Sequence, residues 1–361
     1  MSQFVTPHYI FTGENALEDA KNVIGTFGKK ALLVTGRHIG KSPMFKSLTD
    51  TLNDIGTDYA VFDGITGEPT DTMIAEGLDI YKKENCDFLI GIGGGSPLDS
   101  AKAIAAMAVN PGKISDYNGK IIEGKVPPIV AIPTTAGTGS EATKFTIVTD
   151  TEKGIKMLLK GDCLVPDVAV INPEYTVDMP KTVTAATGLD ALTHAVEAYT
   201  SVKAGELTDD LAISAVKRIV KYLPRVYKNG CDMEARNQML IAAFEAGICI
   251  NNSSVTIVHG MSRPIGALFH VPHGLSNAML LKECIGFALD GAYERFADLG
   301  RAVGVATKED VDEMAAKKFL AKLSEVCEAC EVPTLEKYGI DREKFHAVID
   351  KMAEDAIASG S

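Results

Sequence analysis

Short apolar runs rich in β-branched residues alternate with amphipathic stretches through the first half of the chain, and the alternation stops near residue 182. Five of these runs are predicted to be buried strands: ALLVTG (31–36), YAVFDG (59–64), FLIGIG (88–93), PIVAIP (128–133) and VAVINP (168–173). Segments between them, such as PTDTMIAEGLDIYKKEN (69–85), have the apolar spacing of a helix. This order predicts a mostly parallel sheet flanked by helices.

Helical periodicity continues alone after residue 182, in runs such as DDLAISAVKRIVKYLPRVYK and MEARNQMLIAAFEAGICI. We therefore expect two closely packed domains with a cleft between them. The first is a Rossmann-like α/β domain over residues 1–182, and the second is an all-helical domain over residues 183–361. A chain of 361 residues agrees with this at about 100–200 residues per domain.

Charge and apolar patterning exclude several classes of protein. Asp and Glu total 48 against 36 for Lys and Arg, and a net charge of -12 is unsuited to binding a phosphate backbone. No apolar run approaches the roughly 20 residues that span a bilayer, and the first ten residues lack the pattern of a signal peptide. The seven cysteines have no framework spacing, which favours reduced thiols, with a structural role for the Cys327/Cys330 pair. We expect a cytoplasmic protein without nucleic-acid or membrane partners.

Two glycine-rich loops follow two of the predicted strands. In the first, Gly93-Gly94-Gly95-Ser96 leads into a helix from about Pro97, with Asp99 in its first turn. Free backbone N–H groups at a helix start suit a pyrophosphate. The second loop, IPTTAGTGSEAT (132–143), offers several hydroxyls: Thr134, Thr135, Thr138 and Ser140. Such loops also serve packing alone, and the acidic residue of an ordinary Rossmann site is missing, so the residues indicate a dinucleotide site of another kind.

A carboxylate and several histidines form a candidate metal site. Asp190 and His194 are spaced i and i+4, so a helix points both the same way. His259 and His273 are 14 residues apart, and His273 lies in a Pro-His-Gly turn. One carboxylate with three imidazoles suits iron or zinc rather than calcium or magnesium. The alternative is a helix ion pair beside ordinary core or surface histidines.

The sequence resembles the iron-containing alcohol dehydrogenase family. Four motifs occur in the family's order and spacing: GGGSPLDSAK, PTTAGTGSEAT, ATGLDALTHAVEAY and HGMSRPIGALFHVPHG. The resemblance implies a dehydroquinate synthase-like fold, with a nucleotide-binding α/β domain before a helical metal-binding domain. It implies four ligands to a divalent metal, iron or alternatively zinc: Asp190, His194, His259 and His273.

The resemblance also implies cofactor and substrate positions. Residues expected at the pyrophosphate and ribose are Gly94, Gly95, Ser96 and Asp99, and those expected along the rest of the nucleotide cleft are Thr134, Thr135, Thr138 and Ser140. Lys156 matches a lysine that reaches the cofactor. Pocket-lining positions are taken by Phe145, Ile147 and Ile250, for which plain core packing is the alternative.

Two positions depart from the family pattern. Arg263 replaces a histidine that is a proposed proton carrier, and arginine stays protonated. We expect it to attract a negatively charged or strongly polar substrate group, with His270 as a substitute relay or with proton exit through water and a ribose hydroxyl. Gly36 replaces the aspartate of NAD-preferring relatives. Cations follow at Arg37 and Lys41, which favours NADP(H) over NAD(H).

These assignments predict a metal-dependent oxidoreductase that transfers a hydride reversibly between NAD(P)(H) and a small primary alcohol or aldehyde. Its predicted catalytic set is His259, His270 and Arg263. By resemblance we expect a homodimer or larger homo-oligomer. The alternatives are a glycerol- or polyol-type dehydrogenase, a dehydroquinate synthase-like lyase on the same fold, and a metal-free nucleotide-binding protein.

Overall fold

The chain forms two compact units in the computed structural model, which describes residues 3–358. The first unit runs to Thr135 and includes Gly139–Val177, and the second contains Ala136–Thr138 and the chain from Asp178 onward. Three residues of the second glycine loop therefore belong to the helical unit. The predicted division at 182/183 stays a prediction, and positions 1–2 and 359–361 of the predicted ranges lie outside the described residues.

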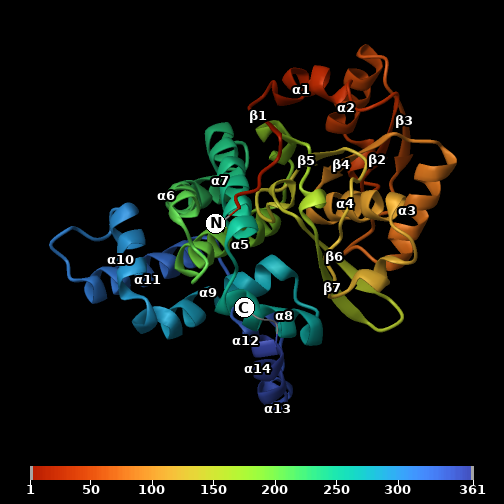
Figure 1. Ribbon diagram of the computed structural model, residues 1–361. Coiled ribbons are helices and arrows are strands. Elements are labelled where there is room, and N and C mark those ends of the chain that lie inside the picture. The colour runs from red at the N-terminus through yellow and green to blue at the C-terminus, as the bar shows by residue number, and fades with distance from the viewer. Residues whose placement is uncertain (1–2, 359–361) are drawn as a thin grey trace. The chain divides into compact units, whose positions relative to one another are not determined.

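A six-stranded sheet forms the centre of the first unit (Figure 1). In spatial order its strands are β1 (Tyr9–Thr12), β8 (Val168–Ile171), β5 (Ile129–Pro133), β4 (Phe88–Gly93), β2 (Lys30–Val34) and β3 (Asp58–Phe62). All neighbouring pairs are parallel, which confirms the predicted fold class of this half. β4, β5 and β8 are buried along their whole length because helices cover both faces.

Helices on the two faces make two separate hydrophobic cores. On one side lie α1 (Ala16–Ile24) and α2 (Pro43–Asp54), and on the other α3 (Asp71–Lys83) and α4 (Gly95–Val109). Successive strand residues point to opposite faces, so Leu32 joins the second core while Leu33 joins the first. The helix predicted within 69–85 is confirmed as α3.

An antiparallel hairpin, β6 (Phe145–Asp150) and β7 (Ile155–Lys160), was not predicted. Short 3-10 helices complete the connections: η1 (Ile39–Lys41), η2 (Ile114–Tyr117), η3 (Ser140–Ala142), η4 (Asp162–Leu164), η5 (Pro173–Thr176) and η6 (Leu289–Gly291). The edge strand β1 was also missed, because Tyr9 and Ile10 are exposed and give no continuous buried run.

The second unit is helical throughout its described part, as predicted. Its helices are α5 (Lys181–Thr200), α6 (Glu206–Lys228), α7 (Met233–Asn252), α8 (Ile257–Phe269), α9 (His273–Ala288), α10 (Tyr293–Ala302), α11 (Asp312–Ala329), α12 (Leu335–Tyr338), α13 (Arg342–Ala347) and α14 (Ile349–Ala358). α5 packs against α6, α7 and α9, and its residues from Gly188 to Tyr199 are all buried. It is the central helix of this unit.

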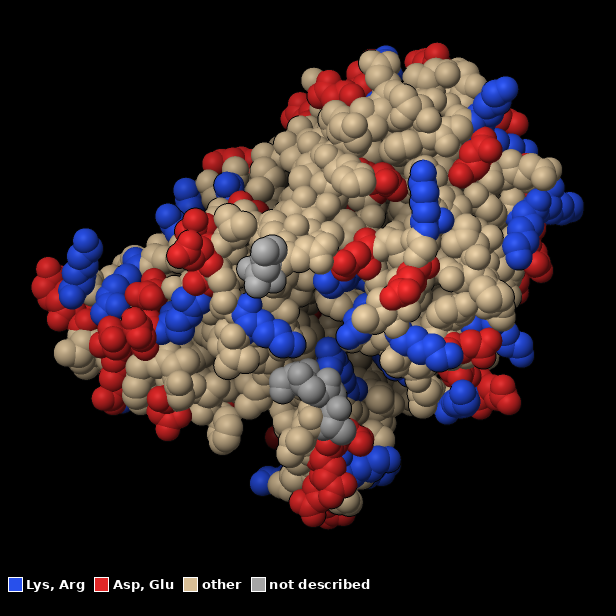
Figure 2. All heavy atoms as spheres, viewed as in Figure 1, with Lys and Arg blue, Asp and Glu red and all other residues tan. Residues whose placement is uncertain are grey.

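Within residues 3–358, no helix is by itself both long enough and apolar enough to cross a membrane. α7 and α8 pass that test of length and composition only as a pair, with a bend of 99° between them. Acidic and basic side chains are interspersed on the face drawn in Figure 2, so the net charge of -12 does not gather there into one acidic patch.

Candidate functional site

Three helices of the second unit bring the four predicted metal ligands together. Asp190 and His194 lie one turn apart on α5, His259 is on α8, and His273 is the first residue of α9. Asp190 Oδ1 lies 3.9 Å from His194 Nε2, 3.7 Å from His259 Nε2 and 3.7 Å from His273 Nε2. A four-coordinate metal with ligands at about 2.0–2.2 Å separates them by roughly 3.3–3.6 Å. The spacing therefore fits a single divalent ion.

Burial controls the charge states of these ligands. Asp190, His194 and His259 are buried, whereas His273 is partly exposed. Burial lowers the pKa of His194 and takes the pKa of His259 well below its usual value, which favours the neutral form that a metal ligand needs. Burial alone would raise the pKa of Asp190, but the three imidazoles and the Asn277 amide bring it below its ordinary value.

Asn277, which the sequence analysis missed, directs its side-chain amide into the same cluster. Its Nδ2 lies 2.7 Å from Asp190 Oδ1, 3.0 Å from His259 Nε2 and 3.3 Å from His273 Nε2. Its Oδ1 is buried without a hydrogen-bond partner. This nitrogen is within hydrogen-bond distance of candidate ligand atoms from three residues, which indicates that those atoms face a common centre. Asn277 is one helical turn after His273, a spacing that could have identified it.

Glu197 is a second residue that the sequence analysis missed. It lies on α5, three residues after His194, and is fully buried. Its Oε2 is 2.5 Å from His259 Nδ1, on the side of the ring opposite the ligand atom Nε2. Burial raises the pKa of Glu197, and hydrogen bonds from the backbone of Val258 and His259 oppose that rise.

The two predicted proton-relay positions differ in their surroundings. Arg263 is one turn after His259 on α8, partly buried, and its charge contributes to the low pKa of His259. Burial lowers the pKa of Arg263 and Glu197 opposes this, so the two side chains interact electrostatically. His270 is exposed at the end of α8 with a left-handed φ of 54°, and it is not part of the four-ligand group. The relay roles of both residues stay predictions.

The two glycine loops meet within the first unit, because β4 and β5 are neighbours in the sheet. The N–H of Thr134 donates to the carbonyl of Gly93 over 2.8 Å, and a Cβ on Gly94 would lie 3.4 Å from the Thr135 methyl carbon. Gly93 has a φ of 149°, and a side chain there would collide with Pro97. The first backbone N–H groups of α4 therefore lie next to glycine residues, which have no side chains to cover them.

Asp99 differs in placement from the sequence expectation. The helix begins at Gly95 rather than near Pro97, so Asp99 lies beyond the first turn of α4. Its Oδ1 accepts from the Ser140 hydroxyl over 2.6 Å, and its Oδ2 accepts from the N–H of Ile147 over 2.9 Å. Both oxygens therefore join α4 to the second loop and to β6. A direct contact of Asp99 with a nucleotide stays a prediction.

Lys102, one turn after Asp99, is fully buried beneath the same loop. Its Nζ donates to the carbonyl of Thr143 over 2.7 Å, to the Thr143 hydroxyl over 3.2 Å and to the carbonyl of Phe145 over 3.0 Å. Burial lowers the pKa of Lys102 to about 8 and raises the pKa of the neighbouring Glu141 to about 7. This cluster fixes the path of the chain between η3 and β6.

At Gly36, two residues after β2, the backbone leaves no room for a side chain. Gly36 forms a bridge with Gly64, and a Cβ at position 36 would lie 2.9 Å from the carbonyl oxygen of Ile65. Arg37 and Lys41 are exposed on the segment that follows. The loop therefore presents cations and no carboxylate at position 36.

The other predicted positions are spread over both units. Lys156 on β7 forms an ion pair with Glu68 at 2.7 Å, and its reach to a cofactor stays a prediction. Phe145 and Ile147 lie on β6 in the first unit, whereas Ile250 is buried in α7 of the second. Thr138 belongs to the second unit and Ser140 to the first. Their pocket-lining and cofactor roles stay predictions.

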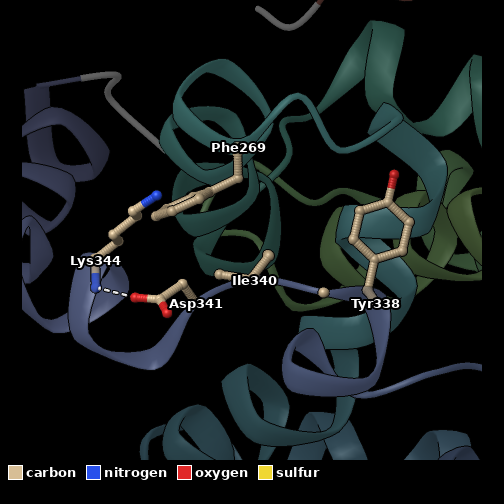
Figure 3. A pocket seen from close by; sticks show the side chains of 6 residues that line it. Phe269, Tyr338, Ile340, Asp341 and Lys344 are labelled. Atoms are coloured by element: carbon tan, nitrogen blue, oxygen red, sulfur yellow. Dashed lines mark hydrogen bonds between the residues drawn. The ribbon is translucent and has the colours of Figure 1, made fainter.

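A pocket of about 200 Å³ at the end of α8 contains none of the predicted site residues (Figure 3). It is lined by Phe269, Tyr338, Gly339, Ile340, Asp341 and Lys344. Its carboxylate is already engaged, because Asp341 caps α13 by accepting from the N–H of Lys344 over 2.8 Å. The four candidate ligands converge at the Asp190 cluster instead.

Two family models together match nearly the whole chain. "Iron-containing alcohol dehydrogenase" matches residues 7–173, and "Fe-containing alcohol dehydrogenase family, C-terminal" matches residues 184–361. The chain belongs to the iron-containing alcohol dehydrogenase family. Its predicted family is therefore confirmed, and it is an oxidoreductase of the alcohol dehydrogenase class from a family that binds a divalent metal and NAD(H).

Relatives in this family match over nearly their full length. The NAD-dependent methanol dehydrogenase of Bacillus methanolicus is 36% identical over 358 residues, 98% of this chain and 94% of the relative. The NADPH-dependent butanol dehydrogenase of Clostridium saccharobutylicum is 34% identical over 364 residues, 99% of this chain and 92% of the relative. A crystal structure of a 1,3-propanediol oxidoreductase matches with a TM-score of 0.95 at 34% identity, covering 99% of this chain and 94% of that one. The predicted fold class is thereby confirmed.

Proposed function

We propose that this protein is a metal-dependent dehydrogenase that interconverts small primary alcohols and aldehydes with NAD(P)(H). The observation that carries the proposal is the convergence of four ligand atoms, from Asp190, His194, His259 and His273, within 4.8 Å of one another. Residues 1–182 serve as the nucleotide-binding domain and residues 183–361 as the metal-binding catalytic domain. Small alcohols named in the relatives, methanol, butanol and 1,3-propanediol, support this substrate size.

The Asp190 cluster is the candidate holder of Fe²⁺, with Zn²⁺ as the alternative. A cation bound there would supply Lewis-acid chemistry to the alcohol or carbonyl oxygen, and the coenzyme would supply or take up the hydride. Asp190 supplies the negative charge that balances part of the ion's charge. His194, His259 and His273 supply neutral nitrogen donors and keep the ion in a largely buried environment, which strengthens its electrostatic effect. Arg263 attracts a polar or anionic substrate group, and His270 is the candidate proton relay.

The coenzyme is held by the glycine loops of the first unit. Gly94, Gly95 and Ser96 offer backbone N–H groups at the start of α4, which suits a pyrophosphate. The loop hydroxyls and Lys156 complete the nucleotide site. Phe145, Ile147 and Ile250 line the alcohol pocket. The protein acts in the cytoplasm as a homodimer or larger homo-oligomer.

NADP(H) is the proposed coenzyme of choice. Gly36 supplies no carboxylate to repel a 2′-phosphate, and exposed Arg37 and Lys41 are close in sequence to attract it. Relatives with both preferences are known by name, so the choice follows from these residues of the chain. We expect Arg37→Ala to raise the KM for NADPH several-fold and to leave the KM for NADH unchanged. Equal kcat/KM values of the wild type with NADH and NADPH would contradict the preference.

The metal proposal is tested by elemental analysis of anaerobically purified protein together with turnover of a panel of small aldehydes. We expect one equivalent of iron or zinc, and activity that disappears in Asp190→Ala while NADPH binding persists. His270→Ala is the comparison outside the ligand group, and it should retain the metal. A wild-type protein that neither contains metal nor gains turnover on addition of Fe²⁺ or Zn²⁺ would leave only nucleotide binding.

A further inference from the structure

The central helix α5 carries three ionisable side chains on one face. Asp190, His194 and Glu197 are spaced by four and three residues, which places them on neighbouring turns. Asp190 and His194 belong to the four-ligand group, and Glu197 does not. Glu197 is nonetheless fully buried, so its carboxylate must have partners that offset the loss of water.

Those partners all come from the start of α8. Glu197 Oε1 accepts from the N–H of Val258 over 2.6 Å, from the N–H of His259 over 3.3 Å and from the Thr256 hydroxyl over 3.1 Å. The first N–H groups of a helix lack partners within the helix, and Thr256 does not cap this end with its own side chain. Glu197 therefore takes the place of a cap residue for α8 and fixes where this helix begins.

The remaining oxygen, Oε2, lies 2.5 Å from His259 Nδ1. The opposite nitrogen, Nε2, lies 3.0 Å from the Asn277 amide nitrogen, which is a donor. The amide is oriented with its nitrogen inward because that atom also donates to Asp190 Oδ1 over 2.7 Å. This geometry favours His259 Nε2 as the acceptor, with the hydrogen on Nδ1 donated in a hydrogen bond to the carboxylate of Glu197.

We propose that Glu197 is a positioning residue for the metal ligand His259. By accepting the hydrogen of Nδ1, it holds the imidazole in the tautomer whose Nε2 lone pair faces Asp190, His194 and His273. By capping α8, it holds the backbone of the same histidine. The inference rests on the metal site of the proposed function, and it adds a residue that acts on the metal only through His259.

Carboxylate partners of ligating histidines typically contribute a factor of 10–100 in metal affinity. Glu197→Gln preserves the shape of the side chain and removes one acceptor. The amide oxygen satisfies the three donors of α8, which leaves the amide NH₂ group against His259 Nδ1. Two donors cannot face each other, so the ring is driven toward the tautomer with hydrogen on Nε2, where the metal should bind.

The test compares the Zn²⁺ affinities of the wild type, Glu197→Gln and Thr256→Val by competition with a chromophoric chelator. Thr256→Val is the matched control, because it removes a hydrogen bond to Oε1 and leaves the Oε2 contact with His259 intact. We expect a 10–100-fold weaker affinity in Glu197→Gln and an affinity within about twofold of the wild type in Thr256→Val. Equal affinities in all three proteins, or equal losses in both variants, would overturn the proposal.

A second measurement needs no variant at Glu197. In metal-free wild-type protein labelled with ¹⁵N-histidine, the two ring nitrogens of His259 report which one carries the hydrogen, with His259→Gln providing the assignment. We expect hydrogen on Nδ1, and hydrogen on Nε2 would overturn the proposal. A wild type that binds no metal but has hydrogen on Nδ1 would refute the proposed function and leave the hydrogen-bond assignment standing.

Discussion

Gly274, the second residue of α9, lies against the backbone of α5 beside the ligand Asp190. A Cβ at this position would be 2.6 Å from the carbonyl oxygen of Ala186 and 3.3 Å from Asp190 Cβ. Carbon atoms and carbonyl oxygens normally come no closer than about 3.3 Å, so Gly274→Ala must move α9 away from α5 by roughly 0.7 Å. The obstacle is backbone, which cannot rotate aside as a flexible side chain would.

This displacement changes the metal site because His273 is the residue just before Gly274. His273 Nε2 is now 3.7 Å from Asp190 Oδ1, and metal–ligand distances tolerate only about 0.2 Å of error. We expect Gly274→Ala to weaken Zn²⁺ binding by about tenfold or more. Overpacking typically costs about 1–3 kcal/mol, while replacing a helical glycine by alanine returns about 0.5–1 kcal/mol. The metal-free variant should therefore be less stable by about 1–2 kcal/mol.

Gly286→Ala is the control on the same helix, since its Cβ would make an ordinary contact of 3.5 Å with Leu320. That variant should be slightly stabilised and should bind Zn²⁺ as the wild type does. Urea unfolding of the metal-free proteins gives the stabilities, and chelator competition gives the affinities. Wild-type Zn²⁺ affinity in Gly274→Ala would refute the argument that close approach of α9 to α5 sets the ligand geometry.

Two further expectations concern the buried cluster under the second glycine loop. Burial raises the pKa of Glu141 from 4.5 to about 7. Between these pH values the unfolded state binds fewer protons than the folded state, so the stability of the wild type falls as pH rises through that window. Glu141→Gln removes this titration, so the stability of the variant relative to the wild type should rise by about 3 kcal/mol between pH 4.5 and pH 7. The exposed Glu152→Gln is the control. A stability difference between Glu141→Gln and the wild type that does not change with pH over this range would contradict the assignment. Lys102→Met removes the donor to Thr143 and Phe145 and should lower the free energy of unfolding by about 3 kcal/mol. A loss below about 0.5 kcal/mol in urea unfolding would show that the second glycine loop does not depend on the Lys102 hydrogen bonds.

The parallel sheet could be predicted from sequence because its central strands are buried on both faces. FLIGIG in β4 and VAVI in β8 are unbroken apolar runs, a pattern typical of parallel strands that helices cover on both faces. The β6–β7 hairpin lacks that signal, since alternate residues such as Ile147 and Leu158 are exposed. The sequence places the start of α4 two residues late because it assigns Pro97 to the first helical position, whereas the helix already begins at Gly95, with Gly94 as its extended N-cap.

The clustering of the four candidate ligands could be predicted because chemistry and spacing agree: Asp190 and His194 share a helix face, and the other two histidines flank a short segment. Their binding of a metal stays a prediction. Glu197 could not be assigned in this way. Its partner His259 is 62 residues away, and nothing in the sequence reveals that the start of α8 lies over α5. Residues that act through a ligand depend on tertiary packing, whereas the ligands themselves are limited to a few residue types.

The buried charges of the helical unit support the proposed binding of a divalent cation, independently of the family to which the chain belongs. Asp190 and Glu197 place two buried carboxylates on α5, and burial lowers the pKa values of His194 and His259, which favours their neutral forms. Arg263 provides a cation close enough to interact with Glu197. The groups that lower the pKa of Asp190 are instead the three imidazoles and the Asn277 amide. A buried carboxylate surrounded by neutral nitrogen donors is costly unless a cation joins it. A divalent ion held by the four candidate ligands would supply that charge, and the Glu197–His259 hydrogen bond would orient one nitrogen donor toward it.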